Sequence, residues 1–211
     1  MLDSSIAENR VTVGGLRFTL MIGPEQIREG IDRIAVELAA RYGAEDPVLV
    51  CVLNGGAIFH ADLVRALRFP VELDYLRVSS YAGEMRSSGV ISFSAAPGTR
   101  MAGRNVIIVE DIVDTGRTAD RLREYFREQG AGSVVVATLL YKRDAHHVGS
   151  PPEYVVFDIP DRFVVGFGLD YHEQGRNLPG IYALCDASET GADFESSSDV
   201  PGRAANPPCG V

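Results

Sequence analysis

One short segment of the sequence concentrates groups that can do chemistry. Residues 105–122 read NVIIVEDIVDTGRTADRL. A run of β-branched residues leads into two adjacent acids, Glu110 and Asp111, and a third acid, Asp114, follows shortly. Carboxylates at the end of a buried strand can bind vicinal hydroxyls, a divalent metal ion, or both. The segment then continues with a glycine, a guanidinium group and two hydroxyl groups, on Thr115, Gly116, Arg117 and Thr118.

The DTGRT run has the properties of an anion-binding loop. In open parallel α/β sheets, ligands bind at the carboxyl ends of the strands. A turn that begins a helix there points backbone N–H groups outward, and the helix dipole favours a negative charge. Gly116 lets the backbone approach a phosphate closely. A ribose 5-phosphate with a metal-bound leaving group would fit both the loop and the acids. The simpler alternative is that these residues only cap their own helix.

Alternating helices and strands must position this segment. Apolar residues recur at helical spacing over 24–42, between Pro24 and Gly43, which predicts a helix with both ends marked. The apolar run at 48–53 predicts a strand buried on both faces, and the sequence NGG ends it. We expect further helices at 57–67 and 118–129, and further strands at 71–81, 90–95, 105–110, 133–141, 154–157, 163–167 and 181–185.

This order of elements predicts the fold class. Buried strands that alternate with helices indicate an α/β fold with a central parallel sheet flanked by helices. We expect residues 1–186 to form one domain. Residues 187–211 are rich in Ser, Gly, Pro and acids, so we expect a disordered tail that the chemistry does not need.

Composition and charge exclude several classes of protein. The 211 residues carry a net charge of −9, and an acidic chain is unlike the basic domains that bind nucleic acid. No apolar run approaches the ~20 residues of a membrane span, and the N-terminus has no apolar signal core. The three cysteines, Cys51, Cys185 and Cys209, are odd in number and irregular in spacing, which favours a reducing compartment. We therefore expect a cytoplasmic protein with no membrane or nucleic-acid partner.

The sequence VIIVEDIVDTGRT resembles the signature of the type I phosphoribosyltransferases, with the Glu-Asp pair of their 6-oxopurine branch. Other segments resemble that branch in the same order. VLNGGAIFHADLVRAL resembles its pyrophosphate loop and VSSYAGEMRSSGVI its mobile lid. LLYKRD resembles the segment with the base-contacting lysine, and IPDRFVVGFGLDYHEQGRNLPGIYAL resembles the base-binding hood. The matches span about residues 48–184. They identify the chain as a member of the hypoxanthine-guanine phosphoribosyltransferases and imply the type I fold with a small hood subdomain.

The resemblance implies an Mg²⁺-dependent enzyme of purine salvage. It would transfer the 5-phosphoribosyl group from phosphoribosyl pyrophosphate to hypoxanthine or guanine. Asp114 would be the general base or acid at the purine N7. Glu110 and Asp111 would face the ribose hydroxyls, in part through Mg²⁺, and Asp170 would help to hold a second Mg²⁺. The other implied roles are 5-phosphate binding by Asp114, Thr115, Gly116, Arg117 and Thr118, purine contacts by Lys142, Phe163, Val164 and Asp170, pyrophosphate contacts by Asn54, Gly55 and Arg176, and a lid that begins at Ser80 and Tyr81.

One position departs from the family pattern. The family commonly has a lysine where this chain has Asn54, so a side-chain charge is missing from the pyrophosphate loop and weaker substrate affinity is expected. Taken singly, other residues have simpler interpretations: Lys142 as a surface cation, Phe163 as a core residue and Arg176 as a solvated loop residue. Only the joint pattern favours the functional roles. The adjacent histidines at 146–147 are interpreted as loop residues rather than metal ligands.

Two rival functions remain compatible with the sequence. One is a regulator that senses phosphoribosyl pyrophosphate on the same fold and binds RNA, which the net charge of −9 disfavours. The other is a transferase that prefers xanthine. The resemblance implies a homodimer or homotetramer but does not decide between them.

Overall fold

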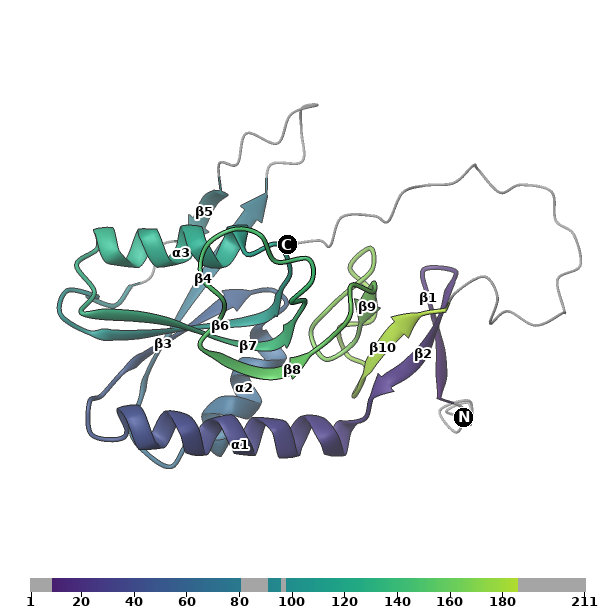
Figure 1. Cartoon of the computed structure of the whole chain (residues 1–211), viewed down its shortest axis with the longest axis horizontal. Coiled ribbons are helices and arrows are strands. Elements are labelled where there is room, and N and C mark those ends of the chain that lie inside the picture. Colours follow the sequence, from purple (N-terminus) through teal and green to yellow (C-terminus); the bar gives the residue numbers. More distant parts are fainter. Residues whose placement is uncertain (1–8, 81–90, 96–97, 186–211) are drawn as a thin grey trace, which may run out of the picture.

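The computed structural model describes residues 9–80, 91–95 and 98–185. These residues form a central six-stranded sheet with helices on both faces and a separate four-stranded sheet beside it (Figure 1). The helices are α1 (Pro24–Tyr42), α2 (Ala57–Ala66) and α3 (Arg117–Glu128). The strands of the central sheet are β3 (Val48–Leu53), β4 (Glu72–Ser80), β5 (Ile91–Ala95), β6 (Asn105–Val113), β7 (Ser133–Tyr141) and β8 (Tyr154–Asp158).

The central sheet has the order β5-β4-β3-β6-β7-β8. All neighbouring strands pair in parallel except β5, which is antiparallel to β4 at the edge. The predicted α/β class with a central parallel sheet is thus confirmed. β6 lies between β3 and β7, so the acids on β6 lie in the middle of the sheet.

The helices divide the core of the sheet into two layers. Successive side chains of a strand point to opposite faces, so each buried strand supplies both layers. On one face, Leu49 and Ile107 pack with residues of α1 and α2, such as Ile31 and Phe59. On the other face, alternate strand residues pack against α3, with the core residues Val50, Ile108, Leu122 and Phe126 among them. Figure 1 shows α1 and α2 below the sheet and α3 above it.

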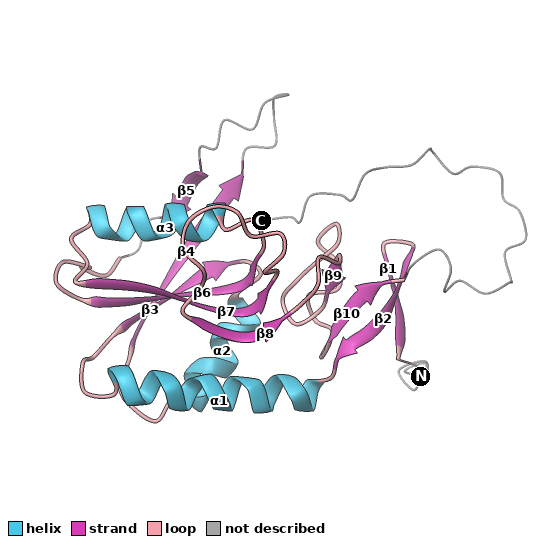
Figure 2. Ribbon diagram, viewed as in Figure 1, coloured by secondary structure: helices cyan, strands magenta, loops and turns pink. Residues whose placement is uncertain are grey.

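A second, antiparallel sheet forms the hood. It has the order β1-β2-β10-β9 and comprises β1 (Arg10–Val13), β2 (Leu16–Ile22), β9 (Val164–Val165) and β10 (Ile181–Leu184). Figure 2 shows its strands as a group apart from the central sheet. In the hood, the N-terminal hairpin β1–β2 therefore pairs with β10, a strand from the C-terminal half of the chain. We did not predict that hairpin, although Gly14 and Gly15, at φ of 56° and 83°, provide a turn signal between alternating strand residues.

Several predicted boundaries were wrong, and one of them concerns the acids. β6 was predicted to end at 110, but it continues to Val113 because Ile112 and Val113 still pair with β7. Glu110 and Asp111 therefore lie within the strand rather than at its end. β9 is only two residues long, shorter than the predicted strand at 163–167.

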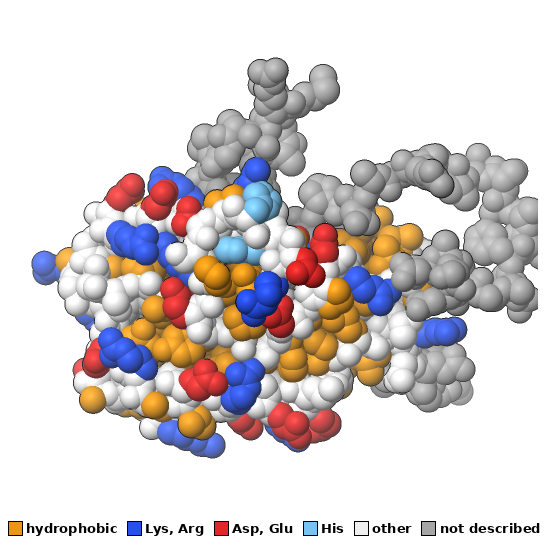
Figure 3. Space-filling view, viewed as in Figure 1, with side chains coloured by type: hydrophobic (Ala, Val, Ile, Leu, Met, Phe, Trp, Pro, Cys, Tyr) orange, Lys and Arg blue, Asp and Glu red, His pale blue; other side chains and the backbone are white. Residues whose placement is uncertain are grey.

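Some predictions concern residues outside the described ranges. The expected tail at 187–211, the lid residue Tyr81 and Cys209 belong to this group. Within the part of the chain that the structure describes, no helix is both long enough and apolar enough to cross a membrane. On the face of the molecule in Figure 3, basic and acidic side chains are interspersed rather than separated into patches.

Candidate active site

Two adjacent carboxylates from β6 form the floor of the candidate site. Glu110 is 4% exposed, and Asp111 is partly buried. Desolvation raises the pKa of Glu110 well above its ordinary value, and the charge of Asp111 adds to that rise. Desolvation likewise raises the pKa of Asp111 to about 6, although the Ile112 amide donates a hydrogen bond to its Oδ1 at 3.0 Å. A buried acid, Glu110, thus lies beside the partly buried Asp111, and a nearby cation would favour the ionisation of both.

The loop at 114–116 leads from these acids into α3. Gly116 is the N-cap residue, with φ of 89°, and its cap has no side-chain hydrogen bond. The Arg117 amide donates to Thr115 Oγ1 at 3.5 Å, so DTGRT also contributes a side-chain contact at the start of its own helix. Arg117 and Thr118 form the first turn of α3, where N–H groups and the helix dipole can hold an anion.

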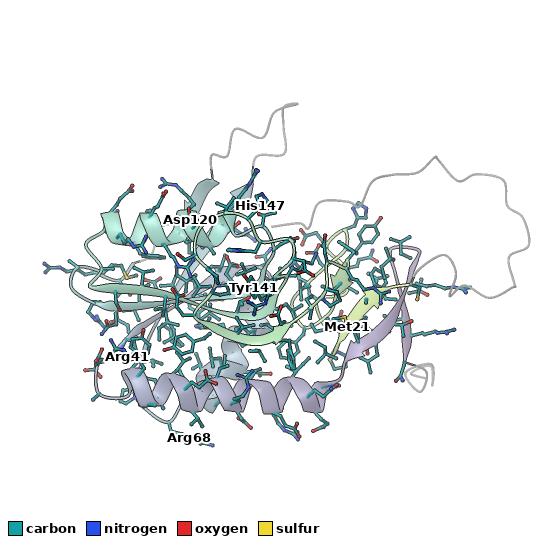
Figure 4. All side chains as sticks on the ribbon, in the orientation of Figure 1. Met21, Arg41, Arg68, Asp120, Tyr141 and His147 are labelled. Atoms are coloured by element: carbon teal, nitrogen blue, oxygen red, sulfur yellow. The ribbon has the colours of Figure 1, made fainter. Side chains whose placement is uncertain are left out.

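The loop after β7 holds the anion-binding loop in place. The amides of His147 and Val148 both donate to the Thr115 carbonyl oxygen, at 3.2 and 3.1 Å. A Cβ at Gly116 would lie 2.2 Å from the Val148 carbonyl oxygen, so only glycine fits there. Figure 4 labels one residue from each of these elements, Asp120 on α3, Tyr141 on β7 and His147 in the loop. The close packing fixes the shape of the anion-binding loop.

Arg123, on α3, connects that helix to the loop after β7. Its guanidinium group is 2% exposed and donates to the carbonyl oxygens of Ser150 and Pro151, at 2.8 and 2.9 Å. It also donates to Glu153 Oε2 at 2.7 Å, and that same oxygen accepts from the Val136 amide at 2.8 Å. Helix α3, the loop after β7 and the sheet are therefore joined through one buried cation.

Lys142 directly follows β7, and its ammonium group contacts the carboxylates of Asp114 and Asp161. It is 2% exposed, so the interpretation as a surface cation is wrong. Its Nζ donates to Asp114 Oδ2 at 3.3 Å and to Asp161 Oδ1 at 3.0 Å. The structure thus brings the predicted general base and the predicted base-contacting lysine into one hydrogen-bonded group. Asp161, in the loop before β9, is a member of this group to which we assigned no role from the sequence.

The hood contributes two predicted base-contacting residues, the aromatic Phe163 and the buried Val164. Phe163 is partly buried, with ring centroids 6.1 Å from Phe18 and 5.7 Å from Tyr171. Val164 is 3% exposed and pairs with Ala183 of β10. Phe163 thus packs partly into the hood, in line with its interpretation as a core residue. It also directly precedes Val164, whose backbone was predicted to contact the base.

Arg176 is held against the acids rather than solvated. Its Nη2 lies 2.8 Å from Asp170 Oδ1, and its Nη1 donates to the Gly168 carbonyl oxygen at 2.9 Å. The charge of Arg176 lowers the pKa of Asp111 and that of Asp170 raises it, although desolvation remains the largest influence. The structure therefore brings these three predicted residues into electrostatic contact. Asp170 is paired with Arg176 through Oδ1, and its Oδ2 accepts a hydrogen bond from the Glu173 amide at 2.8 Å.

The loop after β3 meets both the acids and the hood. A Cβ at Gly55 would lie 1.7 Å from Asp111 Oδ2, and a Cβ at Gly168 would lie 2.1 Å from the Gly55 carbonyl oxygen. Asn54 follows a cis peptide bond, and its Oδ1 accepts a hydrogen bond from Arg77 Nη2 at 2.8 Å. Arg77, on β4, thus brings a cation to the loop position that lacks the family's lysine. We did not assign Arg77 from the sequence, since nothing in the pattern of β4 distinguishes it.

The predicted lid begins where β4 ends. Ser80 is the last residue of β4, and β5 returns antiparallel to it. Tyr81 and the following segment lie outside the described residues.

We expect Gly55→Ala to impair binding of phosphoribosyl pyrophosphate, the substrate that the sequence resemblance implies. The new methyl group would collide with the Asp111 carboxylate, and relieving an overpacked contact costs about 1–3 kcal/mol, so KM for this substrate should rise about tenfold or more. Initial rates with this substrate varied provide the measurement. Gly98→Ala is the control, because a Cβ at Gly98 has nothing within 4 Å. Equal KM values for both variants and the wild type would show that Gly55 tolerates a side chain.

The fold corresponds to that of the type I phosphoribosyltransferases. A family model described as "Phosphoribosyl transferase domain" matches residues 23–172. A curated protein from Streptococcus pneumoniae, named hypoxanthine-guanine phosphoribosyltransferase, is 41% identical over 165 residues, covering 78% of this chain and 92% of its own length.

Solved structures agree with the sequence comparison. The structure of a hypoxanthine phosphoribosyltransferase from Staphylococcus aureus aligns with a TM-score of 0.78 at 30% identity, over 92% of this chain and 100% of that one. A hypoxanthine-guanine phosphoribosyltransferase from Bacillus anthracis aligns with a TM-score of 0.75 at 34% identity, over 79% and 98% of the two chains. The chain therefore belongs to the hypoxanthine-guanine phosphoribosyltransferase family.

Proposed function

We propose that this protein transfers the 5-phosphoribosyl group from phosphoribosyl pyrophosphate to hypoxanthine or guanine. The products would be the purine nucleoside 5′-monophosphate and pyrophosphate. The observation that carries this proposal is the group formed by Lys142 and Asp114, with Nζ and Oδ2 3.3 Å apart. A buried ammonium donor beside a carboxylate suits a purine that presents an acceptor at C6 and a proton at its imidazole ring.

The other site residues divide among the parts of the two substrates. The loop from Asp114 to Thr118 would bind the 5-phosphate through N–H and hydroxyl groups. Phe163 would stack on the purine, and the Val164 backbone would contact the purine edge. The remaining assignments are Glu110 and Asp111 to the ribose hydroxyls, Asn54, Gly55 and Arg176 to pyrophosphate, Asp170 to the purine side of the site, and Ser80 and Tyr81 to a lid.

The reaction that we propose is a displacement at the anomeric carbon. With the 5-phosphate held by the loop, the ribose C1 would lie between the purine and the departing pyrophosphate. As the C1–O bond loosens, the charges of Glu110 and Asp111 would favour the oxocarbenium-like state. A purine nitrogen would attack the ribose C1 from the face opposite to pyrophosphate. Asp114 would accept the purine proton at N7. A closed lid would exclude water, which otherwise hydrolyses the activated sugar.

Mg²⁺ is the cofactor that fits this donor set. Glu110 and Asp111 would hold one ion, and Asp170 would help to hold a second. The raised pKa values of Glu110 and Asp111 reflect charges that a divalent cation would compensate. No cluster of three or more metal-ligating side chains occurs among the described residues. Mg²⁺ often takes only one or two carboxylates and completes its shell with water and substrate phosphates. When bound, it would neutralise pyrophosphate and make it a better leaving group.

Mg²⁺ should strengthen the stabilisation that phosphoribosyl pyrophosphate gives to the protein. Ligands that bind only the folded state raise the melting temperature, so this substrate should raise it more with Mg²⁺ than after treatment with EDTA. Glu110→Gln should reduce the difference. Melting curves provide the measurement, and NaCl at matched ionic strength is the control. Equal shifts with and without Mg²⁺ would contradict metal-assisted binding.

The base panel tests the function as a whole. Pyrophosphate release is measured with hypoxanthine, guanine, xanthine and adenine. Turnover with the first two supports the proposal, whereas a clear preference for xanthine supports the alternative acceptor. Binding of phosphoribosyl pyrophosphate without turnover of any base would instead favour the regulator. A regulator has no need of Lys142 beside Asp114, which is why we favour the enzyme.

Assembly and compartment remain expectations of the same proposal. We expect a homodimer or homotetramer in the cytoplasm. On β4, Leu73 and Tyr75 are 39% and 48% exposed, which gives the sheet an apolar surface that a second copy could cover. Light scattering after size-exclusion chromatography would determine the oligomeric state.

A further inference from the structure

Asp161 contacts Lys142 in the candidate site, although no role has been assigned to it so far. It lies between β8 and β9, two residues before Phe163, and its Oδ1 accepts a hydrogen bond from Lys142 Nζ at 3.0 Å. That contact is shorter than the 3.3 Å from the same Nζ to Asp114 Oδ2. The ammonium group therefore lies between a carboxylate of the anion-binding loop and a carboxylate that leads into the hood.

Backbone hydrogen bonds fix the turn that carries Asp161. The Ile159 amide donates to the Tyr141 carbonyl oxygen at 2.8 Å, immediately before Lys142 in the chain. On the other side, the Leu184 amide donates to the Phe163 carbonyl oxygen at 2.9 Å, and Arg162 Nη2 donates to the Leu184 carbonyl oxygen at 2.7 Å. The turn is thus attached to the central sheet at one end and to the hood at the other. The position of the Asp161 carboxylate follows from these attachments.

The burial of Lys142 explains why a second carboxylate matters. A lysine ammonium is a flexible, donor-only group, and its long side chain leaves its direction undetermined without partners. If Asp114 were its only carboxylate partner, the ammonium would be drawn toward the proposed general base and away from the purine. An acceptor on the hood side draws it back toward the place where the base would lie.

We propose that Asp161 is a positioning residue for base recognition. It holds the Lys142 ammonium toward the purine and shares it with Asp114, so that Asp114 remains available as a proton acceptor. Asp161 acts through Lys142 and is not itself assigned a contact with substrate. This inference rests on the proposed function, since it assumes that Lys142 contacts the purine.

The solvent exposure of the Asp161 side chain lets an experiment distinguish a positioning role from a contribution to stability. Its side chain is 58% exposed, and ion pairs with so exposed a partner contribute little to stability. Removing Asp161 should therefore leave the melting temperature almost unchanged. The orientation of Lys142 should nonetheless be lost, and with it much of the affinity for the base.

Asp161→Ala should raise KM for hypoxanthine about tenfold, the size expected when one hydrogen bond to a charged group is lost. KM for phosphoribosyl pyrophosphate should stay within about twofold, since substitutions away from that substrate's contacts have small effects. Asp161→Asn keeps an acceptor oxygen of similar shape and should fall between the alanine variant and the wild type. The control is Asp158→Ala, because Asp158 is a nearby exposed acid whose Oδ2 accepts from Arg143 Nε at 2.7 Å. An Asp161→Ala variant with the kinetics of the control would overturn the proposal.

A double-mutant cycle with Lys142→Ala tests whether Asp161 acts through Lys142. In the Lys142→Ala background, Asp161→Ala should cause no further loss of kcat/KM, whereas independent roles would give additive losses. The cycle is measured with whichever base the wild type uses best. If that base is not a 6-oxopurine, the proposed function fails on the wild type alone. If Asp161→Ala and Lys142→Ala have additive effects on the best base, the positioning role fails even where the proposed function stands.

Discussion

The wild-type protein should turn over hypoxanthine and guanine and use adenine hardly at all. Lys142 is a buried, donor-only cation, and a 6-oxo purine offers it an acceptor at C6. Adenine presents an amino group at that position, so a donor would face a donor and the ammonium would lose a partner. Sites built around a hydrogen bond can reject the mismatched analogue by ~10⁴-fold. The measurement is kcat/KM for each of the three bases.

Lys142→Ala should lose catalytic efficiency with hypoxanthine while its affinity for phosphoribosyl pyrophosphate stays nearly the same. The hydrogen bond that it removes, made by a charged donor, is worth ~1.5–3 kcal/mol. Arg143→Ala is the matched control, because Arg143 is the adjacent cation but pairs with Asp158 on the surface. Efficient use of adenine by the wild type would refute the 6-oxopurine assignment. A Lys142→Ala variant equal to the control on hypoxanthine would separate Lys142 from base recognition.

Asp114→Asn should reduce kcat by ~10²–10⁴-fold, the usual contribution of a general base. Asparagine has nearly the same shape, so the anion-binding loop should persist, and KM for phosphoribosyl pyrophosphate should change little. The variant also exchanges a carboxylate for an amide 3.3 Å from Lys142 Nζ, while the Asp161 carboxylate still accepts a hydrogen bond from that ammonium group.

Single-turnover and steady-state rates, measured together, distinguish loss of chemistry from loss of binding in this variant. Asp144→Asn is the control, since Asp144 is an exposed acid in the loop after Lys142. Near-normal turnover by Asp114→Asn would exclude Asp114 from proton transfer. A large rise in KM with unchanged kcat would assign it to substrate binding instead.

The sequence by itself determined the fold class and most of the elements. Hydrophobic periodicity and terminal residues gave α1 its observed bounds, because Pro24 suits the first position of a helix and Gly43 is a poor helix former at its end. The continuous apolar runs of β3 and β7 likewise identified strands covered on both faces. These features depend on residues that are close in the chain, so a linear pattern can express them. The signature at 106–118 similarly located the acids and the anion-binding loop.

Only the tertiary structure decided how far the strand with the acids extends and what surrounds them. β6 continues to Val113 because β7 still offers hydrogen-bond partners, which no local pattern of β6 reveals. The hood depends on pairing between β2 and β10, whose paired residues Phe18 and Leu184 are far apart in the chain. The contacts of Asn54 with Arg77 and of Lys142 with Asp161 arise in the same way. Burial of Lys142 and the raised pKa values of Glu110 and Asp111 are properties of the packed site, since desolvation exists only once distant segments have come together.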